Sequence, residues 1–506
     1  MRTFEIIILL VNLPLIYWLL FRSNRFPSWA RFLPIFGVGI IIIHLITEGY
    51  RWQMFPIYLL TFIFLLLVVI KHYPRSKQYF IKSKISSIII GIISIILFSL
   101  SAVLGTLLPI FSLPELTGSY PVGTASYHWI DETREELNTD DDTDKREIMV
   151  QFWYPATYVE NPEPNYYWQD YDEIIGSELA KNQKLPEFIF SHFNRIKTNA
   201  MLEAPLSDRQ LIFPVVIYSH GNHCARSWAT NQMEELASHG YIVIALDRTY
   251  NAMATVFPDG RAEYYNSTLK YIGWDRLSDS VKNGITDRSI KLAGYYSNPD
   301  GTYDSVSFRD TLLNKAIREI TITDISFVMN QLEVLNAKNN GSIFENRINL
   351  EKIGAMGFST GGGITEDICE RDKRIKVIIT LDSGTPDKTD KQRPILCVLS
   401  EFSKQGINPK MDNLKGIKGQ YEGKKINVDF VLIKGTFHNI FTDGPLYSPL
   451  KQVTNSGPLD PVYAHHIINT FIVSFFDKHL KENEDISISA VAKNFSEVYY
   501  DSVKNK

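Results

Sequence analysis

The stretch Lys352–Gly362 reads KIGAMGFSTGG, and the fold of the chain can be worked out from it. Its first part, Lys352–Gly357, is a short apolar run that predicts a buried strand, and a helix is expected from Thr360 onward. Between them, residues 357–361 match the pattern G-x-S-x-G. On a tight turn from strand to helix this pattern forms a nucleophile elbow, which raises the serine hydroxyl above the sheet. The stretch therefore predicts Ser359 as a nucleophile. The alternative is an ordinary strand–turn–helix connection.

Strand-like and helical stretches alternate on both sides of this motif. The strand-like runs are Glu147–Tyr154, Phe213–Ser219, Tyr241–Asp247, Lys352–Gly357, Ile375–Asp382, Pro394–Ser400 and Asn427–Lys434. The helical runs are Ser227–His239, Leu312–Leu335, a helix from Thr360 and His465–Leu480. Strands that alternate with helices indicate a mainly parallel sheet with helices on both faces. Together with the elbow, this order predicts an α/β fold of the α/β-hydrolase type.

A serine hydroxyl needs a base to remove its proton, and that base needs an acid to fix its tautomer. The best candidate for the base is His438, which lies in GTFHNIFTD just after the predicted strand that ends at Lys434. The alternative is a loop histidine with a structural role. Two acids fit the chain order: Asp382 ends the first predicted strand after Ser359, and Glu401 follows the second. The pattern alone leaves both open.

An oxyanion hole needs two backbone N–H groups aimed at the developing negative charge. The N–H of Thr360, directly after the nucleophile, is expected to be one of them. The second is assigned to Asn222, because the predicted strand ending at Ser219 is followed by the turn HGNH. A metal site on His220 and His223 is the alternative, but the sequence offers no third ligand nearby. We therefore expect no metal and no cofactor.

These residues resemble a known family, the plasma-type platelet-activating-factor acetylhydrolases, which are serine-dependent phospholipases of the α/β-hydrolase fold. The resemblance extends from about Gly118 to about Leu480. It rests on Pro121-Val122-Gly123, on the runs PVVIYSHGN, LASHGYIV, GFSTGG, LDSG and KGTFHNIFTD, and on Asp247-Arg248.

The resemblance implies a role for each candidate residue. In that family the acid follows the strand directly after the nucleophile, which favours Asp382 over Glu401. The implied triad is Ser359, Asp382 and His438, and the implied oxyanion hole is Asn222 and Thr360. Thr360 stands where an aromatic residue is common in the family, and Asn222 where an apolar one is, so the acyl pocket would differ.

The implied activity is hydrolysis of lipid-like or short-acyl carboxylic esters, without calcium or another cofactor. The alternatives are an acyltransferase that uses the same triad, and a catalytically silent hydrolase-like binding module.

Residues 1–113 are expected to form a transmembrane region. They contain four apolar stretches: Ile6–Phe21, Phe32–Ile46, Met54–Ile70 and Ile85–Leu113. A membrane-spanning helix needs roughly 20 mainly apolar residues, and the first two stretches reach that length only if flanking aromatic residues are included. None of the four shows the polar stripe of a helix on the surface of a soluble protein.

The charges of the loops predict the orientation in the membrane. Residues 22–31 carry three arginines, residues 71–84 carry five basic residues, and residues 48–53 have no net charge. Because short basic loops remain in the cytoplasm, the catalytic domain is predicted to lie outside, anchored in the plasma membrane by several spans.

The remainder of the chain, 114–506, is predicted to be the catalytic domain. Residues beyond 111 include 42 basic and 54 acidic side chains, which argues against a nucleic-acid partner, because binding phosphates needs a basic face. The expected partners are an ester or lipid substrate and the membrane lipids. Two insertions, at 155–210 and 259–305, form either a cap over the site or a peripheral decoration. The three cysteines, Cys224, Cys369 and Cys397, are expected to be free thiols.

Overall fold

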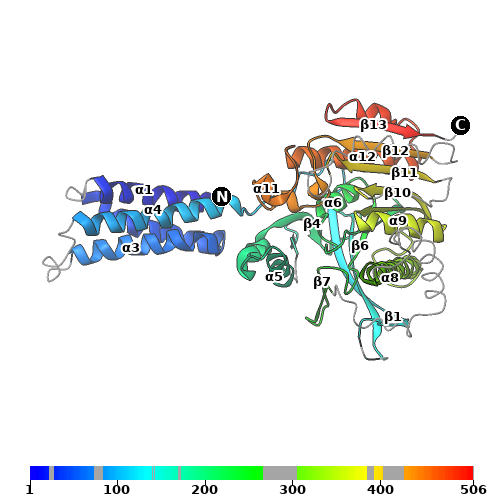
Figure 1. The fold of residues 1–506 in the computed structure, drawn as a ribbon, viewed down its shortest axis with the longest axis horizontal. Coiled ribbons are helices and arrows are strands. Elements are labelled where there is room, and N and C mark those ends of the chain that lie inside the picture. Colours follow the sequence, from blue (N-terminus) through cyan, green and yellow to red (C-terminus); the bar gives the residue numbers. More distant parts are fainter. Residues whose placement is uncertain are drawn as a thin grey trace. The chain divides into compact units, whose positions relative to one another are not determined.

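The computed structural model describes residues 1–21, 28–72, 84–139, 141, 143–168, 172–265, 305–383, 393–402 and 427–504 (Figure 1). The chain divides into two compact units. The first consists of Met1–Phe111 together with Tyr447–Leu450, and the second of Ser112–Leu446 together with Lys451–Lys506. The predicted basic loops at 22–31 and 71–84, and the predicted insertion at 259–305, lie largely outside the described residues.

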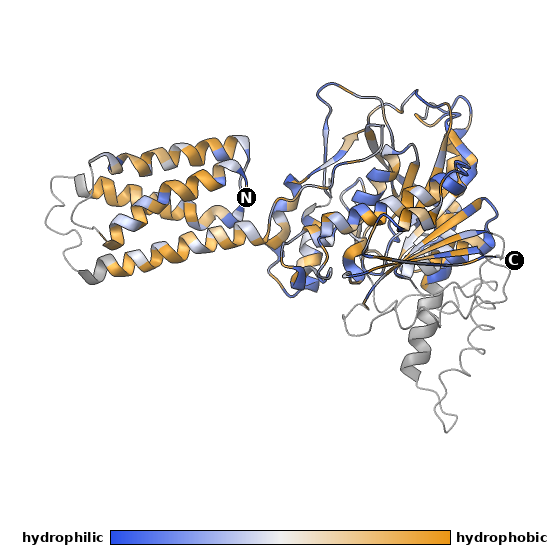
Figure 2. Ribbon diagram, turned by 90° about the horizontal axis from the view of Figure 1, so that it is seen from above, coloured by the Kyte–Doolittle hydropathy of each residue, from blue (hydrophilic) through white to orange (hydrophobic). Residues whose placement is uncertain are grey.

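The first unit contains four long helices. They are α1 (Thr3–Phe21), α2 (Leu33–Thr47), α3 (Phe55–His72) and α4 (Lys84–Leu107), with short 3₁₀ turns at η1 (Ser28–Phe32) and η2 (Trp52–Met54). Four segments are long and apolar enough to cross a membrane: Thr3–Phe21, Trp29–Thr47, Trp52–Ile70 and Ile88–Leu107. Figure 2 shows apolar residues along the whole length of these helices.

Many of these apolar side chains point away from the unit. Ile46 is 78% exposed and Ile96 is 57% exposed, while a smaller set that includes Ile8, Ile41 and Ile57 packs inside. A helix of a soluble protein would instead bury its apolar stripe and expose a polar face. The exposed apolar surface is therefore of the kind that lipid covers.

The second unit is built on an eleven-stranded sheet with the order β13-β12-β11-β10-β9-β5-β6-β2-β1-β4-β3. Its strands are β1 (Val122–Glu135), β2 (Lys145–Pro155), β3 (Pro164–Tyr166), β4 (Lys197–Leu202), β5 (Phe213–Ser219), β6 (Ile242–Leu246), β9 (Ile348–Phe358), β10 (Ile375–Leu381), β11 (Pro394–Ser400), β12 (Asn427–Ile433) and β13 (Val498–Val503). The six strands from β12 to β6 in this order run parallel to their neighbours, and antiparallel strands flank them. Beyond β6, only the pair β1 and β4 is parallel. A separate pair, β7 (Ala254–Val256) and β8 (Ala262–Tyr264), forms a small ribbon.

Helices cover both faces of the sheet. On one face, the apolar core joins the sheet to α8 (Ser305–Asn336) and α9 (Thr360–Arg371); on the other it joins the sheet to α6 (Thr230–Ser238), α12 (Pro461–His479) and α13 (Ile488–Ala492). Alternate residues of β5 explain this: Val215 and Ile217 belong to the first core, and Val216 and Tyr218 to the second. A strand buried on both faces must be apolar throughout. The predicted α/β-hydrolase fold is confirmed.

The region 155–210 turns out to extend the sheet. Its strand β4 pairs in parallel with β1, and β3 pairs with β4, with α5 (Asp172–Asn182) and the 3₁₀ segment η3 (Glu187–Arg195) between them. The sequence pattern had not predicted β1, β3, β4 or β13. All four lie toward the two edges of the sheet, where one or both faces are partly exposed.

Candidate active site

The residue Ser359 occupies a sharp turn between β9 and α9. Its backbone is held at φ +54° and ψ −121°, a strained conformation that few residues other than glycine adopt. The flanking glycines are required because the turn is tight. A Cβ on Gly357 would lie 2.3 Å from the carbonyl oxygen of Gly361, and a Cβ on Gly361 would lie 2.0 Å from that of Ser219. The geometry is that of a nucleophile elbow.

The structure brings the predicted serine, histidine and aspartate together. The Nε2 atom of His438 lies 3.0 Å from Oγ of Ser359, and its Nδ1 atom lies 2.5 Å from Oδ2 of Asp382. The Asp382 side chain is fully buried, whereas that of His438 is 13% exposed. Ser359 is also partly exposed. A hydrogen-bonded chain therefore runs from a buried carboxylate to a hydroxyl that solvent and ligands can reach.

The carboxylate of Asp382 is held in place by Ser400, at the end of the neighbouring strand β11. The backbone N–H of Ser400 donates to Oδ1, and its hydroxyl lies within hydrogen-bond distance of Oδ2, both at 2.9 Å. Asp382 itself has φ +48°. The other acid that the sequence pattern left open, Glu401, instead accepts the backbone N–H of Gly435 at 2.7 Å. Of the two acids, it is Asp382 that hydrogen-bonds to His438.

The loop that carries His438 is fixed from several directions. The imidazole ring of His438 lies against the phenyl ring of Phe358, with the ring centroids 4.7 Å apart. Behind it, Nε2 of His465 lies 3.1 Å from the carbonyl oxygens of Ile440 and Thr442. Burial lowers the pKa of His465 to about 4, so this ring is neutral at pH 7 and donates one proton to these acceptors.

A buried carboxylate anchors the far end of the same loop. Asp443 accepts the backbone N–H groups of Thr230 and Asn231, at the start of α6, at 2.8 and 3.3 Å. It also accepts the hydroxyl of Tyr167, from the region 155–210, at 3.2 Å. Burial raises the pKa of Asp443 well above its usual range. The region 155–210 thus contacts the histidine loop, and the sequence pattern gave no sign of this link.

The two residues predicted for the oxyanion hole lie beside the elbow. Strand β5 pairs with β9, with Ser219 opposite Gly357, so the turn after β5 ends next to Ser359. Asn222 and Thr360 are both exposed there. Within the described part of the chain, neither backbone N–H donates a hydrogen bond to a protein group. Both donors remain available to a ligand.

The histidines of this turn are not arranged as metal ligands. His220 is fully buried, with Nδ1 2.7 Å from the carbonyl oxygen of Gly221 and Nε2 3.4 Å from the backbone nitrogen of Arg248. The ring of His223 instead lies against that of Tyr265. Among the described residues, the group spaced for a metal is in the first unit: Glu5, His44 and Glu48.

The side chains of the cluster Glu5, His44 and Glu48 already form hydrogen bonds and ion pairs with other protein groups. The guanidinium of Arg51 donates to both carboxylate oxygens of Glu5, at 3.1 and 2.9 Å, and Arg2 donates to Glu5 as well. His44 shares its Nδ1 with Glu48 at 2.9 Å. Two cations beside the carboxylates oppose a metal ion, so the cluster is better described as a network that ties helix ends together.

Comparison with known proteins places the chain in a family. The family model described as "Platelet-activating factor acetylhydrolase, isoform II" matches residues 109–494. The chain belongs to this family. It is 24% identical over 349 residues to the platelet-activating factor acetylhydrolase of Cavia porcellus, covering 66% of this chain and 72% of that protein. With the enzyme of the same name from Gallus gallus, it shares 24% identity over 356 residues, 68% of this chain and 77% of that one.

Two further similarities concern esterases. Over 99 residues the chain is 34% identical to cutinase est1 of Thermobifida alba, which covers 18% of this chain and 32% of the cutinase. The solved structure of a ferulic acid esterase from Streptomyces cinnamoneus matches with a TM-score of 0.52 and 21% identity, covering 78% of this chain and 99% of that one. The structural match shows a shared fold. The chain is thus a member of a platelet-activating factor acetylhydrolase-like esterase family.

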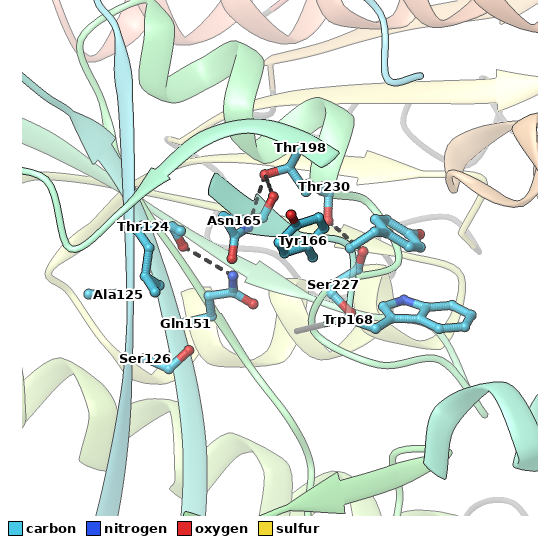
Figure 3. A pocket seen from close by; sticks show the side chains of 12 residues that line it. Thr124, Ala125, Ser126, Gln151, Asn165, Tyr166, Trp168, Thr198, Ser227 and Thr230 are labelled. Carbon is cyan, nitrogen blue, oxygen red and sulfur yellow. Dashed lines mark hydrogen bonds between the residues drawn. The ribbon is translucent and has the colours of Figure 1, made fainter. Parts of the chain in front are cut away.

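A cavity of about 30 Å³ lies elsewhere in the second unit, which we call the hydrolase unit (Figure 3). Its walls are mainly polar: Gln151 donates to Thr124 Oγ1 at 3.1 Å, and Asn165 donates to Thr198 Oγ1 at 2.9 Å. None of Ser359, Asp382 and His438 lines it. The volume suits a water molecule or two, so the cavity is too small to be a substrate site.

Proposed function

We propose that the chain is a membrane-anchored serine hydrolase that cleaves carboxylic esters through Ser359, His438 and Asp382. The observation that carries the proposal is the hydrogen-bonded chain from Asp382 Oδ2 to His438 and on to Ser359 Oγ, at 2.5 and 3.0 Å. A serine on a strained turn, a histidine in contact with it and a buried acid behind the histidine are the parts that acyl transfer requires.

In the first half of the reaction, the alcohol leaves. Ser359 Oγ bonds to the ester carbonyl carbon while His438 Nε2 takes the hydroxyl proton, and the electrons of the broken π bond move to the carbonyl oxygen. The N–H groups of Asn222 and Thr360 donate to that oxyanion. The carbonyl then re-forms, the bond to the alcohol oxygen breaks, and Nε2 gives its proton to that oxygen.

In the second half, water releases the acid. Nε2 of His438 takes a proton from water, and the water oxygen bonds to the carbonyl carbon of the acyl-enzyme. Collapse of this second tetrahedral species breaks the bond to Ser359 Oγ, which recovers its proton from Nε2. Throughout, Asp382 keeps Nδ1 protonated and stabilises the imidazolium.

The substrates are lipid-like or short-acyl esters, of the kind that phospholipases A2 and acetylhydrolases cleave. Two lines of evidence support this class. The relatives that match over most of their length are platelet-activating factor acetylhydrolases, and the first unit carries four apolar helices of membrane-spanning length. An enzyme held at a bilayer meets lipid esters at high local concentration.

The membrane arrangement is part of the same proposal. The four apolar helices span the plasma membrane, and the hydrolase unit lies on the outer side. The support is the charge asymmetry of the short loops, with basic residues concentrated at 22–31 and 71–84 and no net charge at 48–53. An even number of spans then places both ends of the chain on the same, outer side.

Replacing the serine tests the proposed chemistry. In the full-length protein in detergent, Ser359→Ala is expected to lower kcat for p-nitrophenyl esters by about 10⁴- to 10⁶-fold. Ser326→Ala, on α8, is the matched control, because among the described residues its hydroxyl bonds back to the carbonyl of Ile322 in its own helix. Activity of Ser359→Ala within about tenfold of the control would refute the assignment. Screening acyl chains of two to sixteen carbons on the unmodified protein would then define the substrate.

A further inference from the structure

An arginine lies buried directly beneath the turn that carries Asn222. Arg248, just after β6, is 2% exposed. Its Nη2 atom donates to the carbonyl oxygens of His220 and Gly221, at 2.8 and 2.6 Å. Among the described residues, no carboxylate forms an ion pair with Arg248, whereas the nearby Arg226 is paired with Asp247. Burying a guanidinium without a carboxylate partner lowers the stability of the folded state. A functional role would explain why Arg248 is found at this position.

The neighbouring histidine reinforces the same contact. Nε2 of His220 faces the backbone N–H of Arg248, and Nδ1 faces the carbonyl oxygen of Gly221 at 2.7 Å. Nη2 of Arg248 also lies 3.0 Å from Nδ1, so the imidazole and the guanidinium pack directly against each other beside this carbonyl. Burial, and then the charge of Arg248, lower the pKa of His220 well below its usual range, which keeps the ring neutral. The Gly221 carbonyl oxygen thus lies within hydrogen-bond distance of Arg248 Nη2 and His220 Nδ1, and it also accepts the backbone N–H of Cys224 at 3.3 Å.

The geometry of the peptide bond converts these contacts into a direction for Asn222. In a trans peptide, the carbonyl of one residue and the N–H of the next point in opposite directions within one plane, and the described residues include no cis bond. Fixing the Gly221 carbonyl toward Arg248 and His220 therefore turns the Asn222 N–H away from them. Donors on a carbonyl also polarise its peptide group and strengthen the N–H as a donor.

We propose that Arg248, together with His220, is a positioning residue that aims and polarises the Asn222 N–H as a donor of the oxyanion hole. The inference rests on the proposed function. Arg248 touches no reacting atom; it acts through the Gly221–Asn222 peptide, whose carbonyl it contacts. Burial lowers the pKa of Arg248 to about 10, so the group stays charged at pH 7 to 8.

The test uses a thionoester, a substrate in which sulfur replaces the carbonyl oxygen that becomes the oxyanion. Sulfur is a weak hydrogen-bond acceptor, so the ratio of kcat for an ester to kcat for the matching thionoester measures how well the oxyanion hole donates. For Arg248→Met in the full-length protein, kcat for the ester should fall about 10- to 100-fold with KM nearly unchanged. The ester-to-thionoester ratio should fall by roughly tenfold. Arg248→Lys, which keeps the charge but not the planar fork, should give intermediate values.

The control is another buried arginine, in a different role. Arg146 is fully buried and pairs with Asp324 and Glu136. Arg146→Lys should leave the ester-to-thionoester ratio as in the unmodified protein, even if it lowers the melting temperature. Thermal unfolding of each variant measures any loss of stability separately. The ester-to-thionoester ratio does not depend on the amount of folded enzyme, because the same enzyme concentration enters both kcat values.

The outcomes separate this inference from the proposed function. If Arg248→Met and Arg248→Lys both keep the ratio of the unmodified protein while Ser359→Ala abolishes turnover, Arg248 has no part in aiming the donor, and the proposed hydrolase stands. If Ser359→Ala keeps turnover, the proposed function itself fails. Should Arg248→Met not fold, Arg248→Lys alone decides, with an unchanged ratio overturning the inference.

Discussion

Replacing Asp382 by asparagine should disable His438 by forcing the wrong tautomer. The backbone N–H of Ser400 donates to Oδ1 at 2.9 Å, so an asparagine must keep its oxygen at that position. Its NH₂ group then takes the place of Oδ2, which lies 2.5 Å from His438 Nδ1. The Ser400 hydroxyl can accommodate this, because it can turn its proton toward the carbonyl of Phe402, 2.8 Å away.

The consequence for catalysis is large. An NH₂ group facing Nδ1 requires that nitrogen to accept, so the proton of His438 moves to Nε2, 3.0 Å from Ser359 Oγ. A protonated Nε2 cannot take the serine proton. We expect kcat to fall by about 10⁴-fold, or about 5 kcal/mol in activation free energy, with little change in thermal stability.

The assay compares this variant with a matched one. Hydrolysis of p-nitrophenyl acetate and thermal unfolding are measured for Asp382→Asn and for Glu401→Gln. The glutamine can still accept the N–H of Gly435, as Glu401 does at 2.7 Å, so its kcat should remain within about tenfold of the unmodified protein. The reasoning is refuted if Glu401→Gln is the more harmful change, since the acid would then belong to β11.

Three other predictions follow from the structure. EDTA should leave esterase activity unchanged, since neither His220 nor His223 is arranged to hold a metal; activity lost to EDTA and restored by one metal would contradict this. In intact cells, a membrane-impermeant maleimide should label Leu211→Cys, a position 84% exposed, but not the native cysteines, which are all buried; labelling only after lysis would place the hydrolase unit inside. His465, neutral when folded with a pKa of about 4, takes up protons on unfolding below pH 6.5. Its contribution to the free energy of unfolding, up to about 3 kcal/mol, is therefore complete above pH 6.5 and lost as the pH falls to 4. In His465→Gln, the free energy of unfolding measured by denaturation at pH 7, 5.5 and 4.5 should therefore fall less steeply with decreasing pH than in the unmodified protein.

The central strands could be predicted from the sequence because burial on both faces leaves an unmistakable pattern. Strands β5 and β11 begin and end where the apolar runs Phe213–Ser219 and Pro394–Ser400 do. The edge strands could not be predicted in this way. In β1, exposed and buried positions do not alternate regularly, and β13 has no fully buried residue. Their positions depend on pairing partners that a local pattern does not contain.

The candidate site shows a similar division. The elbow around Ser359 is a local feature, with its glycines and flanking elements all in one stretch, so its sequence was sufficient to predict the turn. The choice between Asp382 and Glu401 was not local, because each ends a strand of the same parallel sheet and only the direction of the side chain separates them. The supporting residues Ser400 and Arg248 contact segments distant in sequence. Arg248 belongs to the Asp247-Arg248 pair on which the family resemblance rests, but that pair does not indicate which segment the arginine contacts.

The most direct test of the proposed chemistry is to map the site that a fluorophosphonate modifies. The full-length protein is treated with the reagent, digested with trypsin and analysed by mass spectrometry; the peptide 353–371 contains Ser359 as its single serine. We expect one adduct per chain, on Ser359. Short-chain esters should suppress its formation, and in the His438→Gln variant the adduct should form far more slowly than in the unmodified protein. An adduct on another residue, or ester hydrolysis that continues after Ser359 is fully modified, would contradict the account.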